Sequence, residues 1–223
     1  MKALFFGSIG TLIETSELQR HAFNMAFAAH NLDWHWERSV YRDMLKVAGG
    51  ADRIARFAQM RGADVDVARI HQTKSRLLQT ALIHGGLSLR PGVVETLNRA
   101  RAEGVTVALV TTTTRANVEA ILEAAANTLS VDVFEHVVTR TDVAAPKPAT
   151  DCYMQALAAL NLHPTDALAI EDNMDGITAA MGAGLRTIAF LGENTADHAP
   201  KGAYHVMTDR LEPEAIWDTE TLL

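Results

Sequence analysis

The chain has 223 residues, of which 48% are hydrophobic and 21% are charged, so it has enough apolar material for a sizeable core. The formal net charge of −7 at pH 7 argues against a nucleic-acid-binding protein, which needs clustered basic residues, but still allows a small phosphorylated ligand. The single cysteine, Cys152, excludes an internal disulfide and a multi-cysteine metal site, and it suits the reducing cytoplasm. No histidine-rich sequence surrounds Cys152, so we expect an ordinary cysteine on a helix face rather than a reactive thiol.

The first patterned segment is a short apolar run at residues 2–6. It is followed at residues 7–11 by the sequence Gly-Ser-Ile-Gly-Thr, which indicates a strand that runs into a turn. The run is too short for a signal peptide, and no apolar stretch approaches the roughly 18 residues that span a bilayer. We therefore expect a cytoplasmic protein without membrane contact.

Residues 16–85 carry helical periodicity with almost no strand signal. Helices are predicted over residues 16–29, 36–47, 51–62 and 65–84, with breaks at residues 31–33, 49–50, 61–63 and 85–86. Much of their apolar interior is expected to come from Ala55, Phe57, Ala58, Ile70, Leu77, Leu78 and Leu82. Trp34 and Trp36 are expected to pack within this helical region rather than to stack on a ligand.

From residue 89 onward, helices alternate with strands. Helices are predicted over residues 92–102, 116–126, 150–160 and 176–183, and strands over residues 105–110, 133–138, 167–170, 186–190 and 204–207. Apolar strands separated by helices indicate right-handed crossovers and a parallel sheet, which the first strand joins. The predicted fold class is α/β, with a Rossmann-like parallel-sheet core (residues 1–14 and 89–223) and an inserted α-helical cap domain (residues 15–88).

Polar side chains follow the predicted strands at the edge where an open parallel sheet binds its ligands. A threonine run starts at Thr111, Lys147 follows a later strand, and Glu171 and Asp172 end another. Each has an ordinary alternative explanation: a strand-forming or capping threonine, a solvated lysine, or an acidic helix N-cap. Their succession at strand ends indicates a site for phosphate and Mg²⁺, with hydroxyls and a cation for the phosphate and hard oxygen ligands for the metal.

These motifs resemble those of the haloacid dehalogenase superfamily, subfamily I with a helical cap, over essentially the whole chain. The matching sequence is Gly-Thr-Leu at residues 10–12, Thr111, Lys-Pro-x-x-Asp at residues 147–151, and Glu-Asp-x-x-x-Gly-x-x-Ala-Ala-x-x-Ala-Gly at residues 171–184. Within the superfamily, residues 14–18, 21–24 and 49–54 are similar to the CbbY-type sugar-bisphosphate phosphatases. The resemblance implies a Mg²⁺-dependent phosphatase that acts on a small phosphorylated metabolite.

The resemblance breaks in the catalytic motif, where the family carries Asp-x-Asp-Gly-Thr-Leu. The first aspartate attacks phosphorus and binds Mg²⁺, and the second protonates the leaving group and offers its carbonyl to the metal. Gly7 and Ile9 stand at these positions, which removes covalent and general acid–base catalysis there. Ser8 is expected to point away from the pocket because strand residues alternate, and neither Glu14 nor Glu17 should easily reach an in-line position.

The rest of the implied site is present. The resemblance implies phosphate binding by Thr111, Thr112 and Lys147, and metal coordination by Asp172, with Glu171 nearby, and by the Ile9 carbonyl. Because the family's carboxylate at position 7 is missing, Mg²⁺ binding should be weakened or lost. Binding of inorganic phosphate or sulfate should suffer less, since two negative charges are absent beside it.

The cap also departs from the CbbY-type pattern. That subgroup usually has His where Gln19 stands and Lys where Ala51 stands, so a cationic contact for a distal phosphate is missing. Glu17 and Arg53 remain as candidate contacts for a second phosphate and for sugar hydroxyls, although a solvated helix face explains Arg53 equally well.

The sequence therefore favours a catalytically impaired or inactive phosphatase that keeps a phosphate-binding pocket. The alternatives are an active hydrolase with a rearranged nucleophile, and a non-catalytic interaction or regulatory protein. Likeness of fold cannot separate the three, because function depends on the site. The sequence identifies no protein partner.

Overall fold

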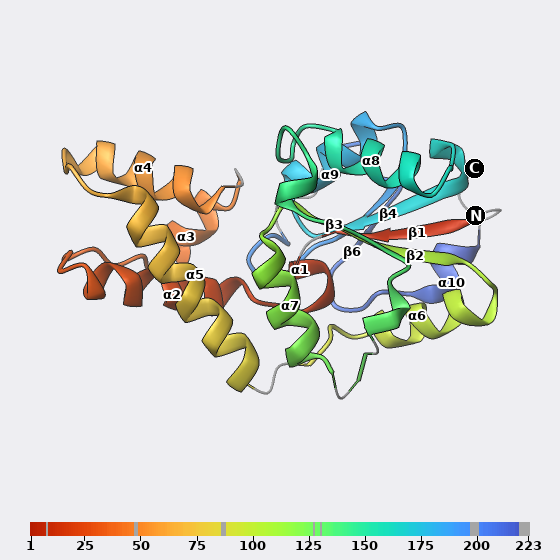
Figure 1. Ribbon diagram of the computed structural model, residues 1–223, viewed down its shortest axis with the longest axis horizontal. Helices are drawn as coiled ribbons and strands as arrows, with labels where there is room; N and C mark the ends of the chain where they lie inside the picture. The colour runs from red at the N-terminus through yellow and green to blue at the C-terminus, as the bar shows by residue number, and fades with distance from the viewer. Residues whose placement is uncertain are drawn as a thin grey trace.

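The computed structural model describes residues 1–7, 9–46, 49–85, 88–126, 128–129, 131–196 and 201–218. Within these ranges, a six-stranded parallel sheet forms one body, and a group of helices lies beside it (Figure 1). The strands are β1 (Ala3–Phe6), β2 (Thr106–Val110), β3 (His136–Val138), β4 (Ala167–Glu171), β5 (Arg186–Phe190) and β6 (His205–Met207). Their order in the sheet is β3-β2-β1-β4-β5-β6, which confirms the predicted α/β class.

The register places the ends of three strands level with one another. Phe6, the last residue of β1, pairs with Leu109 of β2 and Ile170 of β4. The backbone N–H of Gly7 continues this pattern by donating to the Ile170 carbonyl at 2.9 Å. The residues that follow β1, β2 and β4 are therefore gathered at one edge of the sheet, where a parallel sheet binds its ligands.

Helices cover both faces of the sheet (Figure 1). One face packs against α6 (Val93–Ala102), α7 (Arg115–Ala124) and α10 (Pro213–Trp217), and the other against α8 (Asp151–Ala159) and α9 (Met174–Gly182). The side chains of β1 alternate between these layers, with Leu4 and Phe6 in the first and Ala3 and Phe5 in the second. Burial on both faces explains why β1 is apolar throughout.

The cap consists of α2 (Ser16–Ala29), α3 (Arg38–Met44), α4 (Gly50–Arg61) and α5 (Val67–His84). Its interior is a cluster of aromatic side chains, in which the Trp36 ring lies 4.7 Å from that of Phe23 and 4.8 Å from that of Phe27. Trp34 packs edge-on against Phe27 in the same cluster, so the prediction that both tryptophans pack the cap is confirmed. The division at residues 14/15 and 88/89 stays a prediction.

The two connections between cap and core are tied together. The Arg90 N–H donates to the Leu12 carbonyl at 2.8 Å. The Arg90 guanidinium donates to the carbonyls of Gly10 (2.9 Å), Phe190 (2.8 Å), Leu191 (2.7 Å) and Thr208 (3.0 Å). It also stacks on the Phe190 ring, with 3.4 Å between its central carbon and the ring centroid. We call this arrangement the Arg90 clamp.

Several predicted elements differ from the structure. The helix predicted from Trp36 begins at Arg38, because Trp36 is buried in the aromatic cluster before the helix starts; Val47, its predicted end, lies outside the described residues. The strand predicted over residues 133–138 spans only His136–Val138, since Val131–Val133 forms a 3₁₀ turn. The structure adds the short helices α1 (Ile9–Leu12) and α10.

The cap interior differs from the prediction at three positions. Ala55 lies on the exposed side of α4, and Leu78 and Leu82 of α5 pack in the cluster that contains Val118 and Ile121 of α7 instead of in the aromatic cluster of the cap. Among the described residues, no helix has both the length and the apolar character that crossing a membrane would need.

Candidate active site

A cavity of about 460 Å³ lies between the cap and the edge of the sheet where β1, β2 and β4 end. Thr111, Lys147 and Asp172 line it from the core, and Arg53 and Lys74 line it from the cap. Residues from opposite ends of the chain therefore meet in one pocket, at the place that the strand-end pattern predicts.

The threonine run forms the part of the pocket that suits phosphate. Thr111 is buried, its N–H donates to the Val138 carbonyl at 3.0 Å, and its Oγ1 accepts from the Thr113 N–H at 3.2 Å. The run leads into α7, whose N-terminal residues also line the pocket. Hydroxyl donors beside a helix N-terminus suit an anion, and both Thr111 and Thr112 line the cavity.

Lys147 lies in the same wall and is largely buried. Its Nζ donates to the Val110 carbonyl at 2.7 Å and to Glu171 Oε1 at 2.5 Å. The Tyr153 hydroxyl donates to the same carboxylate oxygen at 2.5 Å. The lysine therefore lies in the pocket wall with its ammonium already paired with a carboxylate of the protein.

Glu171 does not face the pocket. Its side chain is fully buried, and Oε2 has no hydrogen-bond partner among the described residues. Burial raises the pKa of Glu171, although the neighbouring Lys147 ammonium opposes this rise. In this conformation the Glu171 carboxylate turns inward to Lys147 and Tyr153, and its expected place near a metal stays a prediction.

The space that Glu171 enters lies beside two glycines. A β-carbon built on Gly7 would come within 2.8 Å of Glu171 Oε1 and closer still to Oε2. A β-carbon on Gly176, in the first turn of α9, would come within 2.5 Å of Oε1 and again closer to Oε2. We call this space the Gly7–Gly176 slot; the carboxylate fits there because neither residue has a side chain.

The described donors fall short of the magnesium site that the family resemblance implies. Asp172 lines the pocket, and its Oδ1 accepts from Thr11 Oγ1 and from Asn173 Nδ2, both at 3.2 Å. Gly7 supplies no carboxylate and Glu171 is turned away. Among the residues that the structure describes, no three His, Cys, Asp or Glu side chains are grouped to hold a metal ion. The Ile9 backbone begins α1, and its side chain lies outside the described part.

The cap wall holds two buried cations. Arg53 Nε donates to the Met44 carbonyl at 3.2 Å, and its guanidinium lies 5.5 Å from the centre of the Tyr41 ring. Arg53 is only 6% exposed, which excludes the solvated helix face that could have explained it. Lys74 Nζ donates to Gln19 Oε1 at 2.9 Å. Burial, and after it the charge of Arg53, lowers the pKa of Lys74 to about 7.

Lys74 is not among the predicted site residues, although the sequence carries a signal for it. It lies in α5 on the same side as Ile70, Leu78 and Leu82, which are all buried. Residues spaced by four share one face of a helix, so this lysine interrupts an apolar stripe. A cation in such a stripe is either paired or placed for a ligand.

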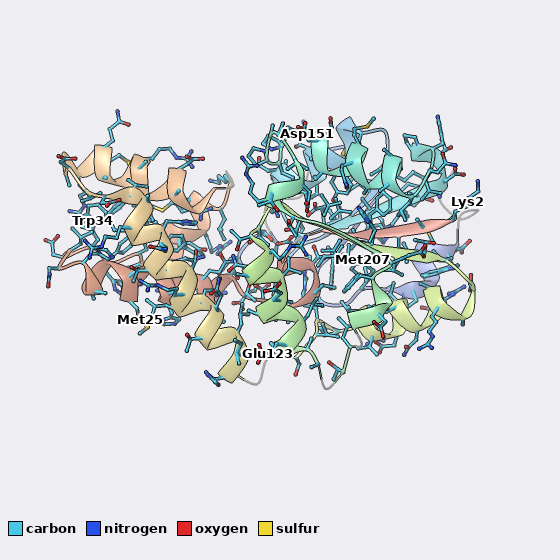
Figure 2. The ribbon with its side chains drawn as sticks, in the orientation of Figure 1. Lys2, Met25, Trp34, Glu123, Asp151 and Met207 are labelled. Carbon is cyan, nitrogen blue, oxygen red and sulfur yellow. The ribbon has the colours of Figure 1, made fainter. Side chains whose placement is uncertain are left out.

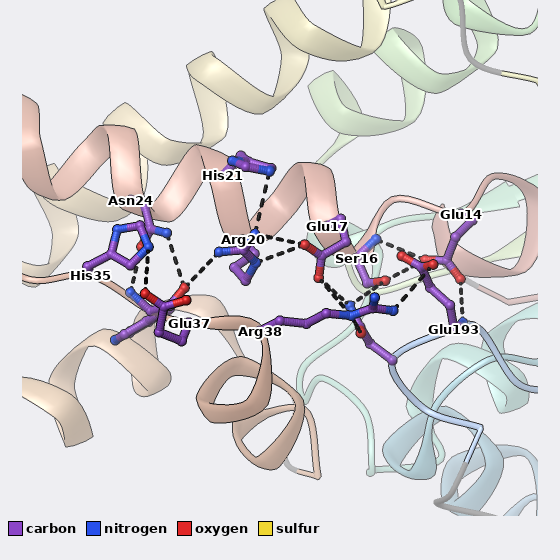
Figure 3. Close-up of polar contacts among 12 residues, drawn as sticks. Glu14, Ser16, Glu17, Arg20, His21, Asn24, His35, Glu37, Arg38 and Glu193 are labelled. Carbon is purple, nitrogen blue, oxygen red and sulfur yellow. Dashed lines mark hydrogen bonds and ion pairs between the residues drawn. The ribbon is translucent and has the colours of Figure 1, made fainter.

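Glu17 lies outside the set of residues that line the pocket. Its Oε1 accepts from Asn194 Nδ2 at 2.8 Å, and Arg20 donates to its Oε2 at 2.9 Å (Figure 3). Arg38 of α3 donates to Asn194 Oδ1 at 3.0 Å and pairs with Glu193 at 3.4 Å. Although burial alone would raise it, the hydrogen bonds from Arg20 and Asn194 hold the pKa of Glu17 below its usual range. Glu17 thus joins cap to core, and its contact with a ligand stays a prediction.

Glu14 and Ser8 are the other two candidates to replace the missing nucleophile, and the structure describes only Glu14. Glu14 lines the pocket, but its Oε1 accepts from Ser16 N at 2.9 Å and Oγ at 2.6 Å, and its Oε2 accepts from Glu193 N at 3.0 Å. Its carboxylate is therefore held by hydrogen bonds at the cap–core connection (Figure 3). Ser8 lies outside the described residues.

Comparison with known proteins agrees with this arrangement. A family model described as haloacid dehalogenase-like hydrolase matches residues 1–184. The chain belongs to this family of hydrolases. The resemblance drawn from the strand-end motifs is thereby confirmed for the family and the fold, while the roles of single residues stay predictions.

Within the haloacid dehalogenase-like hydrolases, the chain is similar to CbbY proteins. Protein CbbY of Rhodobacter capsulatus is 41% identical over 198 residues, which cover 87% of each chain. The crystal structure of a CbbY mutant from Rhodobacter sphaeroides in complex with xylulose-(1,5)bisphosphate gives a TM-score of 0.86 at 38% identity, over 93% of both chains. The crystal structure of CbbY from Rhodobacter sphaeroides in complex with phosphate gives a TM-score of 0.85 at 38% identity, also over 93% of both chains.

Proposed function

We propose that this haloacid dehalogenase-like protein binds a small phosphorylated sugar or inorganic phosphate in the cytoplasm, with little or no turnover. The observation that carries the proposal is at position 7. The family resemblance implies a nucleophilic carboxylate there, whereas this chain has a glycine and the Glu171 carboxylate fills the adjacent space. Without a carboxylate at position 7, a bound phosphate ester has no side chain there to which its phosphoryl can be transferred.

The binding half of the proposal is supported by groups on both walls of the pocket. Thr111 and Lys147 lie on the core wall, and Arg53 and Lys74 lie on the cap wall. Cations on both walls suit a ligand with two anionic groups, such as a sugar bisphosphate. The complex of a related CbbY with such a compound supports this choice of ligand class.

Lys74 changes the expectation for the cap. The sequence predicts that a cationic contact for a distal phosphate is missing at Gln19 and Ala51. In the structure Gln19 instead accepts a hydrogen bond from Lys74, which presents a buried ammonium at the same wall. A ligand phosphate beside this ammonium would favour its charged form and so strengthen binding.

We infer little or no turnover because the pocket lacks the carboxylates expected for phosphoryl transfer and metal binding. Glu14 and Asp172 are carboxylates that line it, and hydrogen bonds hold both in place. We expect Mg²⁺ to bind weakly, because Asp172 alone remains of the expected carboxylates. We also expect no efficient leaving-group protonation, since Ile9 carries no ionisable group.

The test is to assay the purified protein with sugar monophosphates and bisphosphates, with and without Mg²⁺, and to measure phosphate binding by calorimetry. We expect binding without hydrolysis. The matched control is Lys147→Met, which removes the cation at the phosphate wall and should abolish binding. Mg²⁺-dependent turnover by the wild type well above that of Lys147→Met would show an active hydrolase with a rearranged nucleophile.

The reversal Gly7→Asp/Ile9→Asp belongs in the same assay. Turnover by this variant beside a silent wild type would show that the two positions alone account for the loss. A silent variant that still binds phosphate would show that other parts of the site have changed as well.

A further inference from the structure

The Gly7–Gly176 slot has a consequence for the phosphate site beyond the loss of the nucleophile. A carboxylate normally avoids full burial unless each oxygen is paired, because desolvating the charge is costly. Glu171 is fully buried, yet Oε2 has no hydrogen-bond partner among the described residues. Its position is therefore explained by what Oε1 contacts, together with the space that the two glycines leave.

Oε1 contacts the lysine of the phosphate wall. It accepts from Lys147 Nζ and from the Tyr153 hydroxyl, both at 2.5 Å. The Lys147 ammonium has three donors, and two of them are used by Glu171 and by the Val110 carbonyl. A ligand phosphate that is to gain the full charge of Lys147 must share it with Glu171 or displace it.

We propose that Glu171 is an internal counter-anion that, held in the Gly7–Gly176 slot, competes with the ligand phosphate for Lys147 and so limits the affinity of the site. The inference rests on the proposed function, since it concerns the same phosphate pocket. It assigns to Glu171 the role of an affinity-determining residue that acts through Lys147. A side chain at position 7 would exclude the carboxylate from the slot, so the glycine permits this competition.

A competing role and a merely structural role of Glu171 predict opposite effects on phosphate affinity when its charge is removed. A structural role requires that loss of the Glu171 charge weakens folding and ligand binding together. Competition requires that binding improves, because the Lys147 charge becomes available to the phosphate even if the free protein loses stability.

The test compares phosphate and sulfate affinities of the wild type and of Glu171→Gln by calorimetry. Glutamine keeps the shape of the side chain and removes its charge. We expect the affinity for both anions to rise by about tenfold or more. The control, Glu123→Gln, makes the same change on the exposed outer end of α7 and should leave the affinity unchanged (Figure 2). In the double variant Glu171→Gln/Lys147→Met, the gain should disappear.

A second measurement keeps Glu171 in place, in case the substitution prevents folding. With carboxyl-¹³C glutamate incorporated into the wild type, phosphate addition should shift a buried glutamate signal with the same dissociation constant that calorimetry gives. If phosphate binds but shifts no buried glutamate signal, or if Glu171→Gln binds no more tightly than the wild type, the competition does not exist and the proposed function still stands. If neither protein binds phosphate or sulfate, the proposed function fails and this inference fails with it.

Discussion

The buried lysine of the cap, Lys74, should lower the free energy of unfolding by an amount that follows from its pKa. Lys74 is 5% exposed, and burial together with the Arg53 charge lowers its pKa from the ordinary 10.5 to about 7. This drop corresponds to about 5 kcal/mol, at about 1.4 kcal/mol per pKa unit. We expect Lys74→Met to relieve this cost and to lose the hydrogen bond to Gln19, which contributes about 1 kcal/mol, and the cation–π contact with the Phe23 ring at 4.6 Å, which contributes about 1–2 kcal/mol.

The sign of the pH dependence follows from the direction of the pKa change. Between pH 7 and 10.5 the unfolded chain holds a proton on Lys74 that the folded protein has released. The free energy of unfolding of the wild type should therefore rise with pH in this window, by up to about 1.4 kcal/mol per pH unit from this group. Below pH 7 both states are protonated, so the destabilisation is present in full and Lys74→Met should be the more stable protein.

The assay is urea denaturation of both proteins at several pH values from 6 to 9, in buffers free of phosphate and sulfate. The stability advantage of Lys74→Met should be several kcal/mol at pH 6 and should shrink by about 2 kcal/mol between pH 7 and pH 9. Lys46→Met, which changes a lysine that is 58% exposed, serves as the control and should show no such trend. A difference between wild type and Lys74→Met that stays constant over this range would refute the claim that Lys74 is desolvated.

The other predictions concern the remaining polar contacts and Cys152. Sulfate affinity should fall as the pH rises from 7 to 9, because Lys74 loses its proton while sulfate keeps its charge; calorimetry at both pH values tests this. Arg90→Met should lower the free energy of unfolding in urea by about 3–5 kcal/mol, since it leaves the carbonyls of the Arg90 clamp without donors. Asn117→Ala, which removes the acceptor of Gln79 Nε2 and the donor to Thr113 Oγ1, should weaken phosphate binding about fivefold in calorimetry. Burial raises the pKa of Cys152 to about 11, so a thiol reagent at pH 8 should label it in urea but barely in the folded protein.

The sheet and the position of its pocket follow from local patterns. Apolar strands of four or five residues alternate with helices, and this pattern alone specifies a parallel sheet with its ligands at the strand ends. The pattern therefore predicts that Thr111, Lys147 and Asp172 lie in one pocket, and all three line the cavity. Their convergence requires only the strand order, which right-handed crossovers restrict to few choices.

The orientation of single side chains could not be predicted in the same way. Glu171 ends β4, and the sequence pattern assigns it to the pocket edge with Asp172. Its actual direction depends on the empty volume beside Gly7 and Gly176, which are far apart in the chain, and on the Lys147 ammonium. Such a contact depends on three elements packed together, and no local pattern records it.

Trp36 illustrates the same limit for element boundaries. Its periodicity suits a helix, but its ring is drawn into the aromatic cluster and the helix starts only at Arg38. Tertiary packing thus overrides the local helical preference. Lys74 is the opposite case, because the apolar stripe around it in α5 was visible in the sequence and could have identified it.

The Arg90 clamp has a mechanical consequence for the cap. A domain attached by two separate connections can shift sideways as each connection bends on its own. Here the chain leaves the core near Leu12 and returns at Arg90, and a backbone hydrogen bond joins these two points. The guanidinium of Arg90 then fastens the junction to loops that follow β5 and β6. The two connections are thus held together at one junction, which restricts independent bending of either connection near Leu12 and Arg90.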